Sequence, residues 1–310
     1  MNFKIIISLT VAFLFFGCLL ALPNCAIAGE KWLRTGETIF EVTTVNNIDI
    51  INRGSGQFRA YFMRNSSIES TLSSDNGATF SEEGVVISAG GHFAAFKLES
   101  GDVRIYHVDG ASGDLLSSIT NDGFTFTLED GVRISAANSG GIVHPRVLQL
   151  EDGSFKMYYD KKLSSNELDF GKQILSASSS DGLTFTKDPG VRISVKKFEA
   201  ALDKDISLVF SPYVELDDEG KVKLYFTVET ENKPKKTSGV YRATSTNGIK
   251  FKIQKKPVLK IDPAVTNPTN GVGGLTGNPQ DAFIITDSND IDYMYVWQSE
   301  RGYVRATRQN

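Results

Sequence analysis

Four residues suited to acid–base chemistry stand at or near the start of apolar segments of this chain. They are Asp49, His92, His144 and Asp281. Carboxylates and imidazoles can exchange protons near neutral pH once their surroundings shift their pKa values. The chain has only three histidines, and two of them stand at the start of such segments, which favours a functional role for them. The third, His107, ends an apolar segment and is expected to be an ordinary structural residue.

The elements that would position these residues are strands. Short runs rich in Val, Ile, Tyr, Phe and Thr alternate with Gly, Asn and Asp, which is typical of an all-β protein. One turn motif, with Gly three residues before an aromatic residue, recurs at 73–80, 120–126, 180–185 and 246–251. In such a turn the Asp or Asn side chain bonds its own backbone and the Gly takes a positive φ. The repeat therefore predicts four similar hairpins.

The strands around each turn predict a four-stranded blade. In the clearest case, strands at 147–150, 155–159 and 174–178 precede the turn, and one strand follows it. A fifth set of three strands, at 282–285, 293–297 and 303–307, has no turn after it because the chain ends there. Repetition of this kind favours a propeller over the alternative of an irregular β-sandwich.

The N-terminal stretch supplies the outer strand that the fifth blade lacks. Trp32 lies three residues after Gly29, and Phe40 follows eight later, which repeats the spacing seen after the other turns. Pairing the two chain ends would remove the exposed edges of an open ring. The sequence therefore predicts a five-bladed β-propeller closed by pairing of the N-terminal strand with the C-terminal blade.

The first 28 residues are predicted to be a signal peptide, followed by one propeller domain at 29–310. An apolar run at 5–22 ends in Ala26-Ile27-Ala28, which fits cleavage before Gly29. We therefore expect a secreted or periplasmic protein, with an uncleaved membrane anchor as the alternative. Both cysteines lie inside this segment, so the mature chain has no disulfide and no catalytic thiolate.

Composition narrows the expected partners. The net charge is −4 and no basic stripe is present, so no nucleic-acid partner is expected. The Gly-rich segment at 267–279 lacks the pattern of a phosphate-binding loop, and we expect no cofactor. It is expected to form a long rim loop. A monomer is expected.

The repeat resembles known propellers. Ser73-x-Asp75-x-Gly77-x-Thr79-Phe80 resembles the Asp-box of sialidases and other propellers with BNR repeats. The shorter form at 180–185, and strands that open with a Pro, resemble the five-bladed glycoside hydrolases: arabinanases, xylosidases, invertases and levansucrases. The resemblance covers 29–310 and implies the fold and a carbohydrate ligand. It says less about activity, because Asp-boxes are structural turns away from the site.

Counting back from the second-strand tyrosines places His92, His144, Ser211 and Asn278 at equivalent positions near the axis. The resemblance implies an Asp, a second Asp and a Glu on three inner strands. Asp49 can be the first, whereas His144 and Ser211 stand where the second Asp and the Glu are expected. The predicted catalytic residues are Asp49, His144 and Asp281. The predicted substrate-binding residues are His92, Arg146, Ser211, Tyr213, Asn278 and Gln280.

Several alternatives stay open. His144 or His92 can serve as the general acid in place of a Glu, or the loop at 199–205 can carry an acid to the site. The two histidines and a carboxylate can instead bind a metal, although none is expected. A sialidase would use Arg146 together with further arginines. For the whole protein, the sequence favours a glycosidase-like propeller that binds, or binds and hydrolyses, a carbohydrate. The alternative is a non-catalytic propeller that binds a ligand or protein at the cell envelope.

Overall fold

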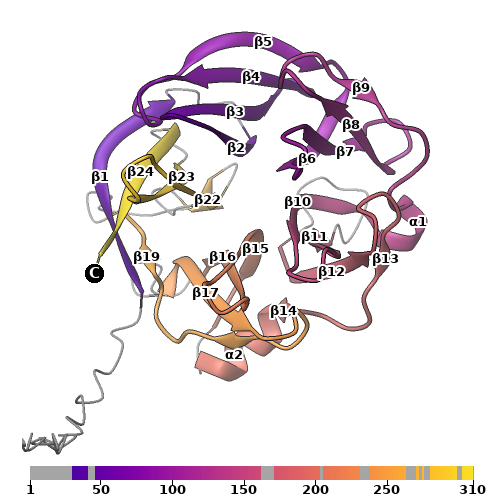
Figure 1. The fold of residues 1–310 in the computed structure, drawn as a ribbon. Helices are drawn as coiled ribbons and strands as arrows, with labels where there is room; N and C mark the ends of the chain where they lie inside the picture. Colours follow the sequence, from indigo (N-terminus) through magenta and orange to yellow (C-terminus); the bar gives the residue numbers. More distant parts are fainter. Residues whose placement is uncertain are drawn as a thin grey trace, which may run out of the picture.

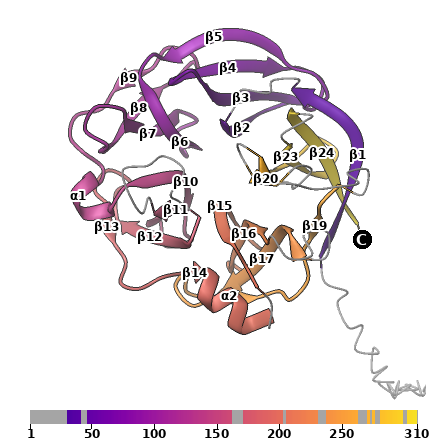
Figure 2. The same cartoon turned by 180° about the vertical axis from the view of Figure 1, so that it is seen from behind.

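The computed structural model describes residues 30–40, 46–161, 171–202, 205–230, 237–262, 270–271, 274–275, 280–298 and 302–309. These residues form five antiparallel sheets arranged in a ring, seen from its two faces in Figure 1 and Figure 2, and one separate two-stranded sheet. The predicted five-bladed propeller is thereby confirmed. Across these ranges, no helix has both the length and the apolar character needed to cross a membrane. The predicted signal peptide lies outside the described residues.

Each blade begins with a strand next to the ring centre and proceeds outward (Figure 1). Blade 1 contains β2 (Asn46–Gly54), β3 (Gln57–Arg64), β4 (Ser67–Ser73) and β5 (Ser81–Ile87). Blade 2 contains β6 (Gly90–Lys97), β7 (Val103–Asp109), β8 (Leu115–Thr120) and β9 (Thr127–Leu128). Blade 3 contains β10 (Ile142–Gln149), β11 (Phe155–Lys161), β12 (Gln173–Ser179), β13 (Thr186–Lys187) and β14 (Ile193–Ser194).

The remaining blades contain both chain ends. Blade 4 contains β15 (Leu208–Leu216), β16 (Val222–Glu229), β17 (Gly239–Ser245), β18 (Lys252–Ile253) and β19 (Leu259–Lys260). Blade 5 contains β22 (Gln280–Thr286), β23 (Asp292–Gln298), β24 (Gly302–Gln309) and, as its outer strand, β1 (Lys31–Phe40). The short elements are α1 (Ala136–Ser139), α2 (Val195–Leu202), β20 (Asn270–Gly271) and β21 (Gly274–Leu275).

The ring closes between β1 and β24, as predicted. The two strands are antiparallel, with Trp32 opposite Arg308 and Leu33 opposite Thr307. The Trp32 side chain is buried in a core shared by blades 4 and 5. Its indole Nε1 donates to Glu30 Oε1 at 2.8 Å, and its backbone N–H donates to the Val258 carbonyl at 2.8 Å. The closing strand is therefore anchored by both packing and hydrogen bonds.

The repeated turns join neighbouring blades. Their glycines, Gly77, Gly123, Gly182 and Gly248, have φ between +65° and +80°. A tyrosine hydroxyl on the second strand of one blade donates to the turn-glycine carbonyl of the next blade. The pairs are Tyr61 to Gly123 (2.6 Å), Tyr106 to Gly182 (2.8 Å), Tyr158 to Gly248 (2.8 Å) and Tyr295 to Gly77 (3.0 Å). In blade 4, Tyr225 donates instead to Glu30 Oε1 at 2.8 Å. The N-terminal segment thus takes the part of a fifth turn.

Replacing Tyr158 by phenylalanine should test these contacts. The change leaves the buried Gly248 carbonyl without its donor, and we expect a loss of about 1–3 kcal/mol in the free energy of unfolding. Tyr159 is the matched control because it is equally buried, but its hydroxyl has no hydrogen-bond partner among the described residues. Tyr159→Phe should therefore be close to neutral in urea titrations. Equal losses in the two variants would contradict the interpretation.

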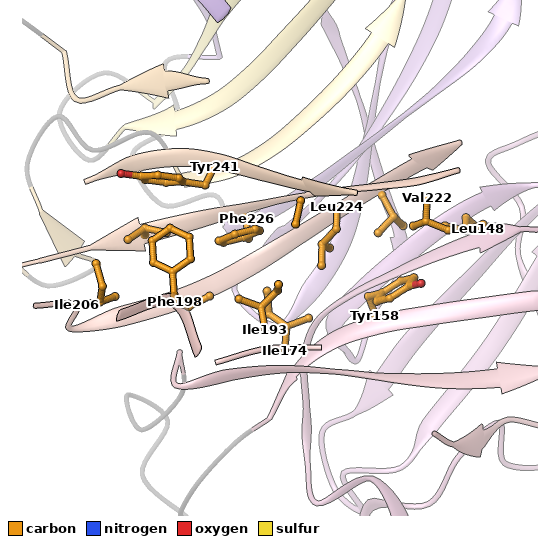
Figure 3. Close-up of a cluster of buried hydrophobic side chains, with 14 residues drawn as sticks. Leu148, Tyr158, Ile174, Ile193, Phe198, Ile206, Val222, Leu224, Phe226 and Tyr241 are labelled. Carbon is orange, nitrogen blue, oxygen red and sulfur yellow. The ribbon is translucent and has the colours of Figure 1, made fainter. Parts of the chain in front are cut away.

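The hydrophobic cores lie between blades. Figure 3 shows the largest, in which Tyr158 and Ile174 of blade 3 face Leu224 and Phe226 of blade 4. Phe198 of α2 is also buried in this core. Its neighbour Glu199 accepts a hydrogen bond from the Ile206 N–H at 3.2 Å, and α2 lies at the outer rim of the ring (Figure 1). The structure therefore places Glu199 away from the axis rather than near the inner strands.

Candidate active site on the propeller axis

All five inner strands carry a β-bulge. The register shifts fall at Asn47 in β2, at Gly91 and His92 in β6, at His144 and Pro145 in β10, at Ser211 and Pro212 in β15, and at Asp281 and Ala282 in β22. A bulge redirects the side chains of its strand, and bulges are frequent next to active sites. Five equivalent bulges around one ring therefore mark the axis as the candidate site.

Four of these bulges hold a polar residue in the left-handed region. The φ values are +58° for Asn47, +46° for His144, +50° for Ser211 and +46° for Asp281. Such a conformation costs about 1–3 kcal/mol for each non-glycine residue and persists only where its surroundings impose it. The sequence count placed Asn278, not Asp281, at the fifth position. Asn278 lies outside the described residues, and the bulge of β22 belongs to Asp281.

His144 is held between two carboxylates. Its Nδ1 lies 2.7 Å from Asp160 Oδ2, and its Nε2 lies 3.9 Å from Asp281 Oδ1. The Ser211 N–H donates to the same Asp160 Oδ2 at 2.9 Å. Burial acts to lower the pKa of His144, but Asp281 and Asp160 outweigh it, and the net result is a raised pKa. The imidazole is therefore set up to carry a proton near neutral pH.

Asp49 and Arg146 form a buried ion pair that links three blades. Arg146 Nε lies 3.3 Å from Asp49 Oδ1, and the guanidinium also donates to the carbonyls of Ile48 (3.2 Å) and Phe93 (3.3 Å). Asp49 Oδ2 accepts a 2.5 Å bond from the Ala95 N–H. Burial raises the pKa of Asp49 to about 7, although Arg146 and the Ala95 amide oppose the rise and Asp281 adds to it. Asp49 thus titrates near neutral pH.

This raised pKa predicts an unusual pH dependence of stability. Between about pH 4 and 7 the folded state keeps the Asp49 proton while the unfolded chain releases it, so stability falls as pH rises. The free energy of unfolding should fall by up to about 1.4 kcal/mol for each pH unit in this range. Urea titrations from pH 4.5 to 8 should show wild type gaining stability relative to Asp49→Asn as pH falls. Parallel curves for the two proteins would contradict the raised pKa.

The predicted substrate-binding residues take different places. The His92 ring contacts the His144 ring edge to face, with centroids 4.6 Å apart. Gln280 is buried and donates to Glu229 Oε1 at 2.8 Å. Tyr213 lies between blades 4 and 5, and its hydroxyl donates to the Ile284 carbonyl at 2.9 Å. His107, which was expected to be structural rather than substrate-binding, lies on β7 with its Nε2 3.2 Å from Ser118 Oγ.

Sequence reasoning missed two buried acids, Asp160 and Glu229. Both lie at the ends of second strands, Asp160 on β11 and Glu229 on β16. Each contacts a residue of an inner strand, His144 and Gln280 respectively. The available signal was a charged residue at the end of an otherwise apolar strand. If such a strand is buried, its charged residue needs a partner, because an unpaired charge is rarely buried.

Several buried polar atoms of the cluster have no hydrogen-bond partner among the described residues. They are Asn47 Nδ2, Asp160 Oδ1, Ser211 Oγ and Asp281 Oδ1. Buried polar groups are otherwise nearly always paired, so a concentration of such atoms at one place indicates a site for a polar ligand or water. Within the described part of the chain, no group of three or more His, Asp or Glu side chains has the geometry of a metal site.

Known structures share this fold. No protein-family model and no curated protein matches the chain. An endo-arabinase from Bacteroides thetaiotaomicron is similar, with a TM-score of 0.65, 12% identity, and coverage of 88% of this chain and 96% of that one. A thermostable family-43 glycoside hydrolase gives 0.64, 13%, 87% and 90%. An endo-1,4-β-xylanase from Bacteroides thetaiotaomicron gives 0.63, 13%, 88% and 97%. The architecture of this chain is therefore that of the five-bladed glycoside hydrolase propellers, as the Pro-led strands indicated.

Proposed function

We propose that this chain is a secreted or periplasmic propeller that binds a carbohydrate at its axis and hydrolyses a glycosidic bond there. In this proposal the signal peptide at 1–28 is removed and the domain works as a monomer. His144 is the general acid, Asp49 is the general base, and Asp281 holds the proton on His144. The fold is shared with an arabinase and a xylanase, which supports a sugar as ligand but does not identify it.

The observation that carries the proposal is the arrangement of His144. Its Nδ1 is bound by the buried Asp160, so Nε2 is the atom that faces Asp281 across 3.9 Å. An imidazole held by a carboxylate on one nitrogen and presented on the other is suited to proton transfer. A second titrating group, Asp49, has a pKa of about 7 and is electrostatically coupled to Asp281. Acid–base catalysis requires such a pair.

The hydrolysis would proceed with both groups in opposite protonation states. His144 donates the Nε2 proton to the glycosidic oxygen as the bond between that oxygen and the anomeric carbon breaks. Asp49 accepts a proton from the water molecule whose oxygen attacks the anomeric carbon. One water is consumed and both catalytic groups exchange their protonation states, which solvent then restores. Glycosidases use an acid and a base on opposite sides of the bond in this way.

The partnerless polar atoms support sugar binding. Sugar hydroxyls both donate and accept hydrogen bonds, and so can pair with the amide donor of Asn47, the hydroxyl of Ser211 and the carboxylate of Asp281. Satisfying a buried polar group recovers the desolvation penalty of about 1–3 kcal/mol that it otherwise incurs. Three such groups therefore favour a ligand with several hydroxyls.

The test is a screen of the full-length protein against aryl glycosides and against arabino- and xylo-oligosaccharides. Turnover of at least one substrate, lost in His144→Gln and in Asp49→Asn, is the expected result. If none is turned over but calorimetry detects binding, the hydrolytic part of the proposal fails. If no sugar binds either, the whole proposal fails.

One observation favours a second function, a non-catalytic sugar-binding module. Ser211 takes the inner-strand bulge of blade 4, where the resemblance to five-bladed glycoside hydrolases implies a Glu as acid. Binding without turnover by wild type, weakened in Ser211→Ala, would establish this function instead.

A further inference from the structure

Asp160 is the most completely buried acid next to His144. It lies on β11 opposite Val143, the residue immediately before the His144 bulge, and none of its surface is exposed. Its Oδ2 lies 2.7 Å from His144 Nδ1, within hydrogen-bond distance, and accepts a hydrogen bond from the Ser211 N–H at 2.9 Å. One carboxylate oxygen therefore fixes residues of two neighbouring blades, β10 and β15.

We propose that Asp160 is a positioning residue that fixes both the tautomer and the orientation of His144, so that the transferable proton is always carried on Nε2. The inference rests on the proposed function. A carboxylate that accepts from Nδ1–H holds that hydrogen in place and leaves Nε2 as the nitrogen that gains and loses the proton. It also stabilises the charged imidazolium.

The bulge makes this support necessary. His144 has a φ of +46°, which is unfavourable for a side chain of its size. The imidazole therefore needs fixed partners to hold one orientation. The Asp160 bond anchors one edge of the ring, and the His92 ring contacts its face or edge at a centroid distance of 4.6 Å. The Ser211 N–H bond fixes the Asp160 carboxylate in turn.

Only one proton leaves His144 in the proposed hydrolysis. Nε2 gives its proton to the leaving oxygen, and the neutral ring keeps the Nδ1 hydrogen bonded to Asp160. Burial raises the pKa of Asp160, whereas the contacts with His144 and the Ser211 N–H oppose the rise. In the proposed step Asp160 acts as a carboxylate and takes no proton. The charged or titratable groups that face His144 are Asp160 from β11, Asp281 from β22, Arg146 from β10 and His92 from β6. Asp160 and Asp281 raise its pKa, whereas Arg146 lowers it.

The first experiment needs no activity. Nuclear magnetic resonance of histidine labelled with ¹⁵N can report tautomer and pKa, and the three histidines are assigned with His92→Gln and His107→Gln. We expect the neutral form of His144 to carry its hydrogen on Nδ1, and Asp160→Asn to lower the pKa of His144. A hydrogen on Nε2 in the neutral wild-type ring would overturn the proposal. This readout stands even if no substrate is found, so it separates this inference from the proposed function.

The second experiment compares substrates whose leaving groups differ in their need for protonation. Loss of a general acid matters most for substrates whose leaving oxygen needs protonation. Asp160→Asn should lower kcat/KM by about 10²-fold on an alkyl or oligosaccharide substrate but less than about 5-fold on a dinitrophenyl glycoside. The high-pH limb of the kcat/KM profile of Asp160→Asn should also move to lower pH. Tyr159→Phe, at the adjacent buried position, should change none of these. Equal losses on both substrates with an unmoved limb would show that Asp160 is only structural.

Discussion

Replacing Asp49 by asparagine should lower kcat/KM by about 10²–10⁴-fold, the contribution typical of a general acid or base. Asparagine keeps the shape of Asp49 and can still accept from the Ala95 N–H, but it cannot take a proton from water. In wild type, kcat/KM should rise with pH through a pKa near 7, because the base must be ionised to act. Initial rates between pH 5 and 9 on the best substrate of the screen measure both effects.

The control for this variant is Asp218→Asn, which removes an exposed carboxylate from the turn between β15 and β16. Its rate and pH profile should match those of wild type. Because Asp49 also pairs with Arg146, the Asp49→Asn protein must be shown by urea titration to be folded under assay conditions. A folded Asp49→Asn protein with unchanged kcat/KM would exclude Asp49 as the base.

Replacing Trp32 by alanine should destabilise the propeller by about 3–5 kcal/mol, the usual effect of deleting a large buried aromatic side chain. Trp32 is only 3% exposed and packs with Met294, Val296 and Val304. The change also removes the indole bond to Glu30. Such a loss is a large share of the free energy of unfolding of a typical domain. A urea midpoint that falls while the m-value stays constant is the expected observation.

Leu33 is the matched control for Trp32. It is the next residue of the same strand, but its side chain points the other way and is 57% exposed. Leu33→Ala should change the free energy of unfolding by no more than about 0.5 kcal/mol. Similar midpoints for the Trp32 and Leu33 variants would mean that β1 does not hold the ring closed.

The closure also bears on the candidate site. Asp49 and Asp281 lie on β2 and β22, the inner strands of blades 1 and 5, which are neighbours only because the ring is closed. Burial is the main cause of the raised pKa of Asp49, and the Asp281 carboxylate adds to it. A variant that loosens β1 should therefore disturb the acid–base chemistry as well as the stability.

The sequence by itself determined the blade count and the closure, through the four turns, the fifth set of strands and the turn-like spacing after Gly29. Each turn depends on contacts within a few residues, such as Asp122 Oδ1 accepting from the Phe124 and Thr125 N–H groups at 2.7 Å. Local contacts of this kind leave a motif in the sequence, because the same residue types are needed at fixed spacing. The absence of a fifth turn at the C-terminus, together with Trp32 at the other end, then led to the pairing that β1 and β24 show.

Only the tertiary structure decided the membership of the axial cluster. Asp160 and His144 lie on two neighbouring strands, and Gln280 and Glu229 lie in two neighbouring blades. Neither contact is marked by a sequence motif of fixed spacing. Asn278 precedes a proline, as His144 and Ser211 do, but the structure has Asp281 at the bulge of β22. Asp281 lies 14 residues before Tyr295, as His144 does before Tyr158, and only the structure shows that Tyr295 is the buried tyrosine bonded to a turn glycine. The chain therefore encodes its ring locally, whereas its chemistry depends on contacts that form only when the blades meet.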